Sequence, residues 1–101
     1  MAKNIEELFK KATDNYGKEN YEASYCSFSY IADYPNSNLS NDAKFWLAKH
    51  LEYGFCIEKN KKKTFEYYSQ VYDNSKSKFR EKARNRLMNF YYYGIGTDKD
   101  E

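Results

Sequence analysis

The sequence predicts an all-α protein, an α-α superhelix of about five antiparallel helices, and three observations support this fold class. Apolar residues recur at helical spacing along the chain, and nothing alternates with period two over a useful length. The segment AKFWLAKHLEYG at 43–54 returns about forty residues later as ARNRLMNFYYYG at 83–94. A fixed period in this range is typical of stacked supersecondary units. A Tyr-Gly pair also ends three of the expected helices, which indicates that they are equivalent members of successive pairs.

The first pair of helices is expected between residues 4 and 33. Asn4 can cap the first helix, and Gly17 is expected to end it in the left-handed conformation. The second helix is expected from about Asn20 to Asp33, because Pro35 cannot continue the hydrogen-bond ladder. The inner faces of the two helices are Ile5, Leu8, Phe9, Ala12 and Tyr16, and then Tyr21, Tyr25, Phe28 and Ala32.

Three further helices are expected at about 40–53, 61–72 and 77–93. Ser40 can cap the third helix, and Gly54 and Gly94 end the third and the fifth. Short loops between successive helices favour antiparallel neighbours. The inner faces are Ala43, Trp46, Leu47, His50 and Leu51 in the third helix, Thr64, Phe65, Tyr68, Val71 and Tyr72 in the fourth, and Phe79, Ala83, Leu87, Phe90 and Tyr91 in the fifth.

The composition indicates a small soluble domain without a strong electric field. Seventeen basic and fifteen acidic residues leave a formal net charge of +2, which argues against a dedicated nucleic-acid binder. The local exception is Lys59 with Lys61–Lys63, where we favour a solvated loop and helix start over a phosphate-binding patch. Cys26 and Cys56 have no zinc-ligand or redox-motif spacing, so free thiols in a reducing compartment are expected. No apolar segment reaches transmembrane length, and a cytoplasmic chain is expected.

The repeated segment resembles the Sel-one-like repeat, a relative of the tetratricopeptide repeat. The second unit matches at Ala43, Leu47, Gly54 and Lys63, with Ala48 in place of the first small Gly and Cys56 in place of the second. The third unit resembles the same pattern through Ala83, Leu87, Tyr91, Gly94, Gly96 and Asp100. The first unit looks more like an ordinary tetratricopeptide repeat, through Tyr21-Glu22-Ala23, Phe28 and Tyr34-Pro35-Asn36-Ser37.

This resemblance divides a single helical-repeat domain, 1–101, into three parts. They are a tetratricopeptide-like pair at 1–38, a Sel-one-like repeat at 39–76, and a partial repeat or C-terminal cap at 77–101. The fifth helix has no sequence partner before the chain numbering ends, so it caps the array, the chain is a piece of a longer array, or a homodimer covers Phe90 and Tyr91. The resemblance implies a non-enzymatic adaptor or scaffold that binds a protein or peptide and needs no cofactor.

The residues that could carry chemistry do not assemble into a catalytic or metal-binding pattern. His50 and Cys56 flank one helix end, but nothing in the sequence orients the imidazole, and no oxyanion-hole motif accompanies them. The segment 94–97, Gly-Ile-Gly-Thr, follows a helix, whereas a phosphate loop follows a strand and opens a helix. The carboxylates are scattered singly along the chain. We therefore expect no catalytic, cofactor or metal site.

A binding surface on the first helix of each pair is the more plausible functional site. In the tetratricopeptide family this helix lines the concave face, and the register implies partner-binding residues Asp42, Phe45, Lys49, Glu52 and Tyr53 on the third helix and Lys82, Asn85, Asn89, Tyr92 and Tyr93 on the fifth. Phe45 and Tyr92, aromatic and off the core stripe, are the expected anchors. The alternatives are a homodimer through the open terminal helix and, less favoured, a nucleic-acid binder through Lys59 to Lys63.

Overall fold

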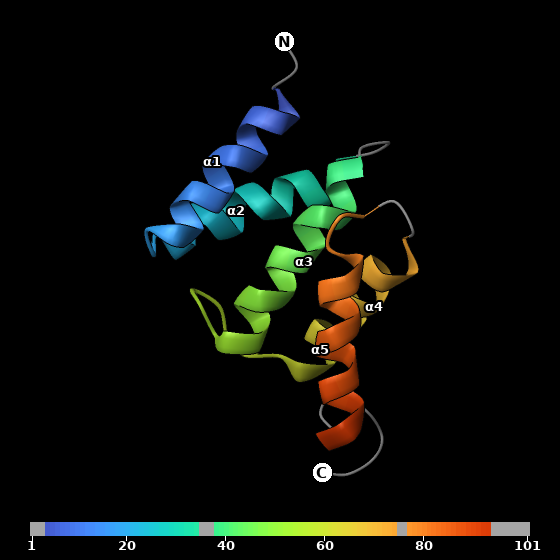
Figure 1. Cartoon of the computed structure of the whole chain (residues 1–101). Coiled ribbons are helices and arrows are strands. Elements are labelled where there is room, and N and C mark those ends of the chain that lie inside the picture. Colours follow the sequence, from blue (N-terminus) through green and yellow to red (C-terminus); the bar gives the residue numbers. More distant parts are fainter. Residues whose placement is uncertain (1–3, 35–37, 75–76, 94–101) are drawn as a thin grey trace.

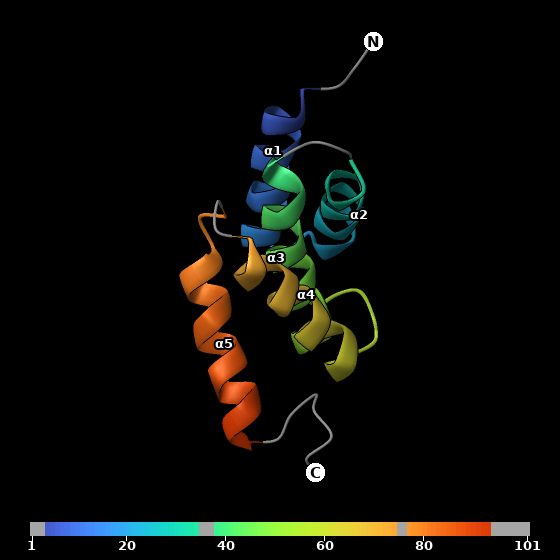
Figure 2. The same cartoon turned by 90° about the vertical axis from the view of Figure 1, so that its right-hand side faces the viewer.

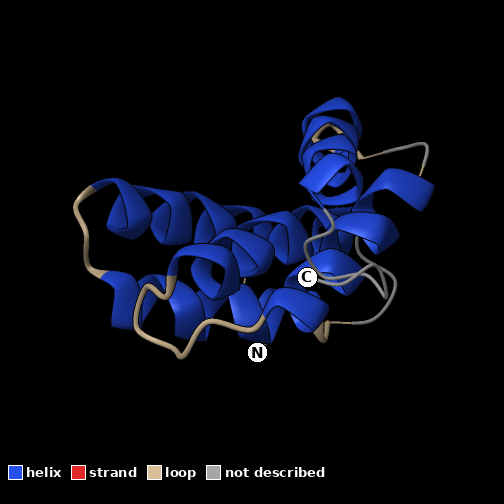
Figure 3. Cartoon of the chain, turned by 90° about the horizontal axis from the view of Figure 1, so that it is seen from below, coloured by secondary structure: helices blue, strands red, loops and turns tan. Residues whose placement is uncertain are grey.

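The computed structural model describes residues 4–34, 38–74 and 77–93, apart from the side chains of residues 38 and 91–93. Within these ranges the chain forms helices joined by loops and contains no strand, which confirms the predicted all-α class (Figure 3). The helices are α1 (Ile5–Gly17), α2 (Tyr21–Ala32), α3 (Asn38–Tyr53), α4 (Lys61–Asp73) and α5 (Arg80–Tyr93).

Asparagine caps set the starts of α1 and α4. Asn4 Oδ1 accepts a hydrogen bond from the Glu7 N–H at 3.2 Å, as the sequence predicted. Asn60 Oδ1 accepts in the same way from the Lys63 N–H at 2.9 Å. Each bond satisfies an amide that the first turn of a helix leaves without an intrahelical partner. The start of these two helices is therefore encoded locally.

The turns within the two helix pairs both contain a left-handed residue that is not glycine. The prediction for α1 was wrong in detail, because Gly17 is its last helical residue and Glu19 takes the positive φ, 66°. The α3–α4 turn contains Gly54 with φ 76°, as predicted, and also Cys56 with φ 74°. A non-glycine residue in this region carries strain of about 1–2 kcal/mol.

The starts of α3 and α5 differ from the prediction. α3 begins at Asn38, so Ser40 lies in its first turn, and the Ser40 hydroxyl donates to the Ala32 carbonyl at 2.7 Å. Ser40 thus ties α3 to the end of α2. α5 begins at Arg80, because the residues before it form a turn in which Ser77 Oγ accepts from the Phe79 N–H at 3.2 Å.

Each helix packs mainly on its neighbours in the chain. α1, α3 and α5 run in one direction and α2 and α4 in the other (Figure 1 and Figure 2). α3 and α5 run parallel but displaced along their axes, since Phe45 in the middle of α3 stacks on Phe79 just before α5, and Glu52 near the end of α3 pairs with Arg86 in the middle of α5. Backbones approach most closely between chain neighbours, so long side chains make most of the contact between α3 and α5.

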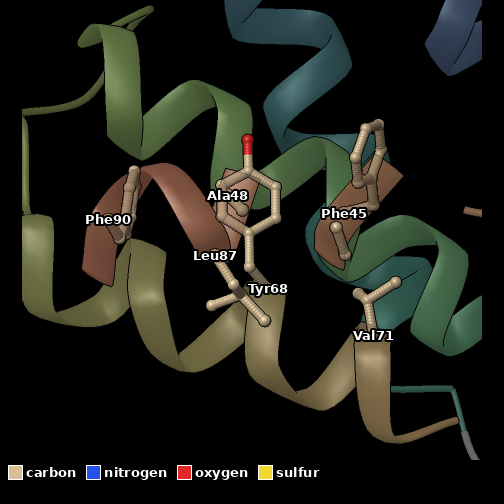
Figure 4. Packing of buried hydrophobic residues seen from close by; sticks show 7 residues of the cluster. Phe45, Ala48, Tyr68, Val71, Leu87 and Phe90 are labelled. Carbon is tan, nitrogen blue, oxygen red and sulfur yellow. The ribbon is translucent and has the colours of Figure 1, made fainter. Parts of the chain in front are cut away.

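Two hydrophobic clusters lie on either side of α3. The N-terminal cluster consists of Phe9, Ala12, Phe28, Ile31, Ala43 and Leu47. The C-terminal cluster consists of Phe45, Ala48, Tyr68, Val71, Ala83, Leu87 and Phe90 (Figure 4). Leu47 and Leu87, the central positions of the sequence repeat, are only 3% and 6% exposed. Trp46 packs against both clusters, so α3 is the element that joins the two halves of the fold.

Candidate functional site

Two of the predicted binding residues on α3 belong to the interior. Phe45 was expected to project into a groove, but it is 4% exposed and stacks on Phe79 with ring centres 4.6 Å apart. Asp42 is 5% exposed and accepts a hydrogen bond from the Ser77 hydroxyl at 2.6 Å. The turn before α5 brings Ser77 and Phe79 onto α3 and covers this face. The assignment of Phe45 and Asp42 as exposed contacts was therefore wrong.

The remaining predicted residues of α3 lie at the edge of this covered face. Lys49 is half-buried, with its ammonium 5.6 Å from the centre of the Phe45 ring and 5.9 Å from that of Tyr53. Burial lowers the pKa of Lys49, the Glu52 charge raises it in part, and the charges of Arg86 and Lys82 lower it. Tyr53 is 44% exposed. Lys49 and Tyr53 thus form the accessible rim of the stacked aromatic rings.

Glu52 is part of a polar network that joins three helices. It accepts a hydrogen bond from the Tyr68 hydroxyl at 2.8 Å and forms an ion pair with Arg86. Its side chain is 13% exposed. Burial, followed by the Glu52 charge, raises the pKa of Tyr68. Because both carboxylate oxygens are engaged inside the protein, Glu52 holds α3, α4 and α5 together.

The predicted residues of α5 that the structure describes are accessible. Lys82, Asn85 and Asn89 are all exposed. The Lys82 ammonium lies 5.8 Å from the centre of the Phe79 ring. The side chains of Tyr92 and Tyr93 lie outside the described residues. The structure therefore brings Lys49 of α3 and Lys82 of α5 to one surface, on either side of the Phe45–Phe79 stack.

Sequence reasoning missed Lys78, which extends this surface toward α1. Its ammonium lies 5.6 Å from the ring centres of both Phe9 and Phe79. We call Lys49, Lys78 and Lys82 the lysine strip, since all three ammonium groups lie over rings joined by the Phe45–Phe79 stack. A cavity of about 470 Å³ opens beside Lys78, lined by Glu6, Phe9, Lys10, Thr13, Leu39, Lys78 and Phe79. The four-residue spacing of Lys78, Lys82 and Arg86 was a signal that could have revealed it.

His50 is fully buried, further inside than the core-edge position expected for it. Its Nδ1 lies 2.8 Å from the Phe55 carbonyl, which can only accept, so Nδ1 carries the proton. Nε2 then accepts from the Ser24 hydroxyl at 2.9 Å. Burial lowers the pKa of the imidazole. His50 therefore bonds α2 and the α3–α4 turn to α3, while Cys56 is exposed to solvent.

The basic run between α3 and α4 is divided between two sides of the protein. Lys59 and Lys63 line a cavity together with Tyr25 and Tyr67, whereas Lys61 lines another with Glu52 and Tyr53. The four lysines do not face one common ligand site. Among the residues that the structure describes, no group of three His, Cys, Asp or Glu side chains could hold a metal ion. None of the helices in the described ranges has the length and apolar character needed to cross a membrane.

The outer surface of α4 and α5 differs from the expected dimer face. Phe90, expected there, is 2% exposed and lies in the C-terminal cluster, and the side chain of Tyr91 lies outside the described residues. Met88 is 54% exposed instead. It borders a cavity of about 440 Å³ lined by Ser69, Tyr72, Asp73, Arg84, Leu87 and Met88. Any contact with another chain on this side would centre on Met88.

Comparison of the chain with protein-family models, curated proteins and solved structures finds no match.

Proposed function

We propose that this chain is a non-enzymatic protein-interaction module, an adaptor or scaffold, that binds a peptide segment of a protein partner along the surface between α3 and α5. The observation that carries the proposal is the lysine strip. Its three ammonium groups lie over the stacked rings of Phe45 and Phe79 and are accessible to a ligand. Lysines on a merely solvated helix face would not be expected to share stacked aromatic rings in this way.

The geometry favours binding because the contact groups are already held in place. The Lys49 and Lys82 ammonium groups lie over aromatic rings, and these contacts reduce the side-chain freedom that is lost when a ligand binds. Tyr53 adds an exposed ring at the rim of the surface, and Asn85 and Asn89 add amide donors and acceptors. A peptide in this position would meet a flat, pre-organised surface about two helices wide.

The same proposal includes an α-α superhelix of Sel-one-like repeats. The supporting features are the parallel direction of α1, α3 and α5 and the sequence repeat between α3 and α5 (Figure 1). Exposed thiols at Cys26 and Cys56 favour a reducing compartment such as the cytoplasm.

Selection of peptides from a random display library, followed by mapping of the bound peptide by amide chemical shifts, tests this function. We expect the shifted amides to gather on α3 and α5 around Lys49 and Lys82. Tyr53→Ala should weaken binding, whereas Tyr30→Ala should not, although Tyr30 is equally exposed at 47% and lies on α2. Shifts that gather on α2, or around Met88, would contradict the proposal.

A second candidate function is self-assembly through the Met88 surface. An exposed methionine beside a cavity is an adaptable apolar contact. Light scattering over a range of concentrations would show a dimer, and Met88→Glu should dissociate it. A monomer at every concentration would exclude this candidate. The nucleic-acid alternative is less favoured, because the lysines between 59 and 63 face different sides.

A further inference from the structure

We infer that the lysine strip selects an acidic peptide segment, in extended conformation, with carboxylates on alternate residues. This inference rests on the proposed function and names the chemistry of its partner. Lys49, Lys78 and Lys82 provide three positive charges on one surface. Three features support this inference: the local charge balance, the position of the ammonium groups over aromatic rings, and their spacing.

The charge balance at the strip is positive. Glu52 on α3 is engaged by Tyr68 and Arg86, and its negative charge also acts on Lys49. Glu6 lines the cavity beside Lys78 but shares it with Lys10, so these two charges offset each other. Glu81 is paired with Arg84 at 3.9 Å. Among the described residues, none of the three ammonium groups forms an ion pair, although the Glu52 charge acts on Lys49.

The position of the ammonium groups over aromatic rings favours a peptide ligand over a nucleic acid. Single-stranded nucleic acids bind by stacking bases on exposed aromatic faces. Here the rings of Phe9 and Phe45 are 7% and 4% exposed, so they support the lysines, and Tyr53 at the rim is the one largely exposed ring described on this surface, which offers no series of stacking faces. Arg86, the residue best suited to bind phosphate with two bonds, is already paired with Glu52. What stays accessible is a set of separate point charges, which suits carboxylates.

The spacing of the charges fits an extended chain. Lys78 and Lys82 are four residues apart and flank the ring of Phe79, at 5.6 and 5.8 Å from its centre. Lys78 lies in the turn before α5 and Lys82 in the first turn of α5, and both ammonium groups lie over one ring. Two residues of an extended peptide advance about 6.6 Å, which brings side chains on alternate residues within reach of both lysines. Side chains on alternate residues of a strand point to the same side. Glutamates at alternate positions of an extended peptide would therefore match the spacing of Lys78 and Lys82.

Fluorescence anisotropy with a labelled short peptide of alternating Glu and Ser tests the inference, with the matching Gln and Ser peptide and an oligouridine as comparison probes. We expect saturable binding of the Glu peptide only, weakened by added salt. In the variant Lys49→Gln, Lys78→Gln, Lys82→Gln the Kd should rise about tenfold. The matched control is Lys59→Gln, Lys62→Gln, Lys63→Gln, which removes the same charge from exposed positions and should leave the Kd unchanged. Circular dichroism verifies that both variants fold.

The outcomes separate this inference from the function on which it rests. If the Glu and Gln peptides bind equally and Tyr53→Ala weakens both, the acidic selectivity is overturned but the binding surface stands. If oligouridine binds more tightly than the Glu peptide, or if only the control variant loses binding, the inference is wrong and the basic loop becomes the site. No saturable binding of the Glu peptide up to about 1 mM would also overturn it.

Discussion

The N-terminal cluster encloses a neutral polar group, whereas the C-terminal cluster borders a charged one. Beside the first, His50 uses one ring nitrogen to donate to the Phe55 carbonyl and the other to accept from Ser24. Beside the second, Glu52 holds Tyr68 and Arg86. Both groups lie on α3, two residues apart, and both tie this helix to its neighbours. Both residues join helices through buried polar contacts, but the stability of the protein should respond differently to the loss of each one.

Because of this difference, we expect the two halves to be destabilised under different conditions. A buried neutral imidazole keeps its hydrogen bonds until it gains a proton, so its weakness is acid. A buried carboxylate with two partners leaves unsatisfied groups when it is removed. The predictions below test this contrast, from the largest expected effect to the smallest.

The largest effects are expected from truncating the central leucines. Leu47→Ala should destabilise the protein by about 2–5 kcal/mol, because a buried leucine is lost together with the packing around it. Leu87→Ala should lie at the lower end of that range, since Leu87 borders the outer cavity next to Met88 and its surroundings can relax. Urea unfolding gives both values. A larger loss for Leu87→Ala would show that the C-terminal cluster dominates the stability.

Removing the charged network should cost more than removing the neutral one. Glu52→Ala deprives Arg86 and the Tyr68 hydroxyl of their shared acceptor, at a cost of about 1.5–3 kcal/mol. Ser24→Ala removes one neutral hydrogen bond to His50, at a cost of about 1 kcal/mol. Tyr68→Phe, which keeps the ion pair, is the matched variant and should also cost about 1 kcal/mol. Equal losses for Glu52→Ala and Tyr68→Phe would mean that the ion pair adds nothing.

Acid should destabilise the N-terminal half in particular. The pKa of His50 is lowered by burial from its ordinary 6.5. Below 6.5 the unfolded chain therefore binds a proton that the folded chain does not, so this part of the stability is complete above pH 6.5 and is lost as the pH falls through the folded pKa. Hydrogen exchange at mildly acidic pH should rise first in α2 and the α3–α4 turn. The imidazole proton shifts should titrate with a midpoint below 6.5.

Alkaline pH provides the control for this prediction, because it acts on both halves. Burial raises the pKa of Tyr16 to about 12, and burial also raises that of Tyr68. A raised tyrosine pKa contributes stability that is complete below pH 10 and is lost as the pH rises toward the folded pKa. Alkaline unfolding should therefore loosen both clusters together. His50→Gln should flatten the acid limb of the stability curve and leave the alkaline limb in place.

The smallest effects are expected at the two strained turns. Cys56→Gly and Glu19→Gly each remove the backbone strain of a non-glycine residue at positive φ, 74° and 66° respectively. Glycine also increases the conformational entropy of the unfolded chain, which offsets part of this gain. Each should stabilise the protein by about 0.5 kcal/mol. Gly54→Ala should act in the opposite direction, because its Cβ would lie 3.1 Å from Lys59 Cγ at a positive φ. Thermal melting resolves the signs, and a destabilised Cys56→Gly protein would show that the thiol itself makes a useful contact.

Local features of the fold could be predicted from the sequence because the sequence encodes them locally. The asparagine caps, the Gly54 turn and the buried stripe through Leu47 follow from residue type and spacing alone. The positive φ at Cys56 had a sequence signal too, since the resemblance places a glycine in that slot. Glu19 had none, and of the Gly17 prediction the helix end was right, whereas the left-handed conformation lies two residues later at Glu19.

The exposed surface of α3 was harder to predict, because other elements cover this helix outside the single apolar stripe that its sequence shows. Phe45 lies outside the predicted core stripe, yet Phe79 covers it from a turn that is distant in the sequence. Only the tertiary arrangement reveals that contact. Lys49 and Lys82 lie near one surface, and their role in binding stays a prediction, whereas Lys78 was missed because the prediction placed it inside a helix start. The identity of a partner remains a proposal tested by the binding experiments above.

The position of Trp46 gives the protein a built-in optical reporter of how its two halves cooperate. It is the single tryptophan of the chain, stacked on Phe28 at 5.6 Å and edge-on to Phe45 and Phe79 at 5.7 and 5.8 Å. Its indole N–H is buried and has no hydrogen-bond partner in the part of the chain that the structure describes. Emission from such an apolar site lies at short wavelength and shifts to the red when water enters from either side. One chromophore therefore distinguishes a single concerted transition from two separate ones.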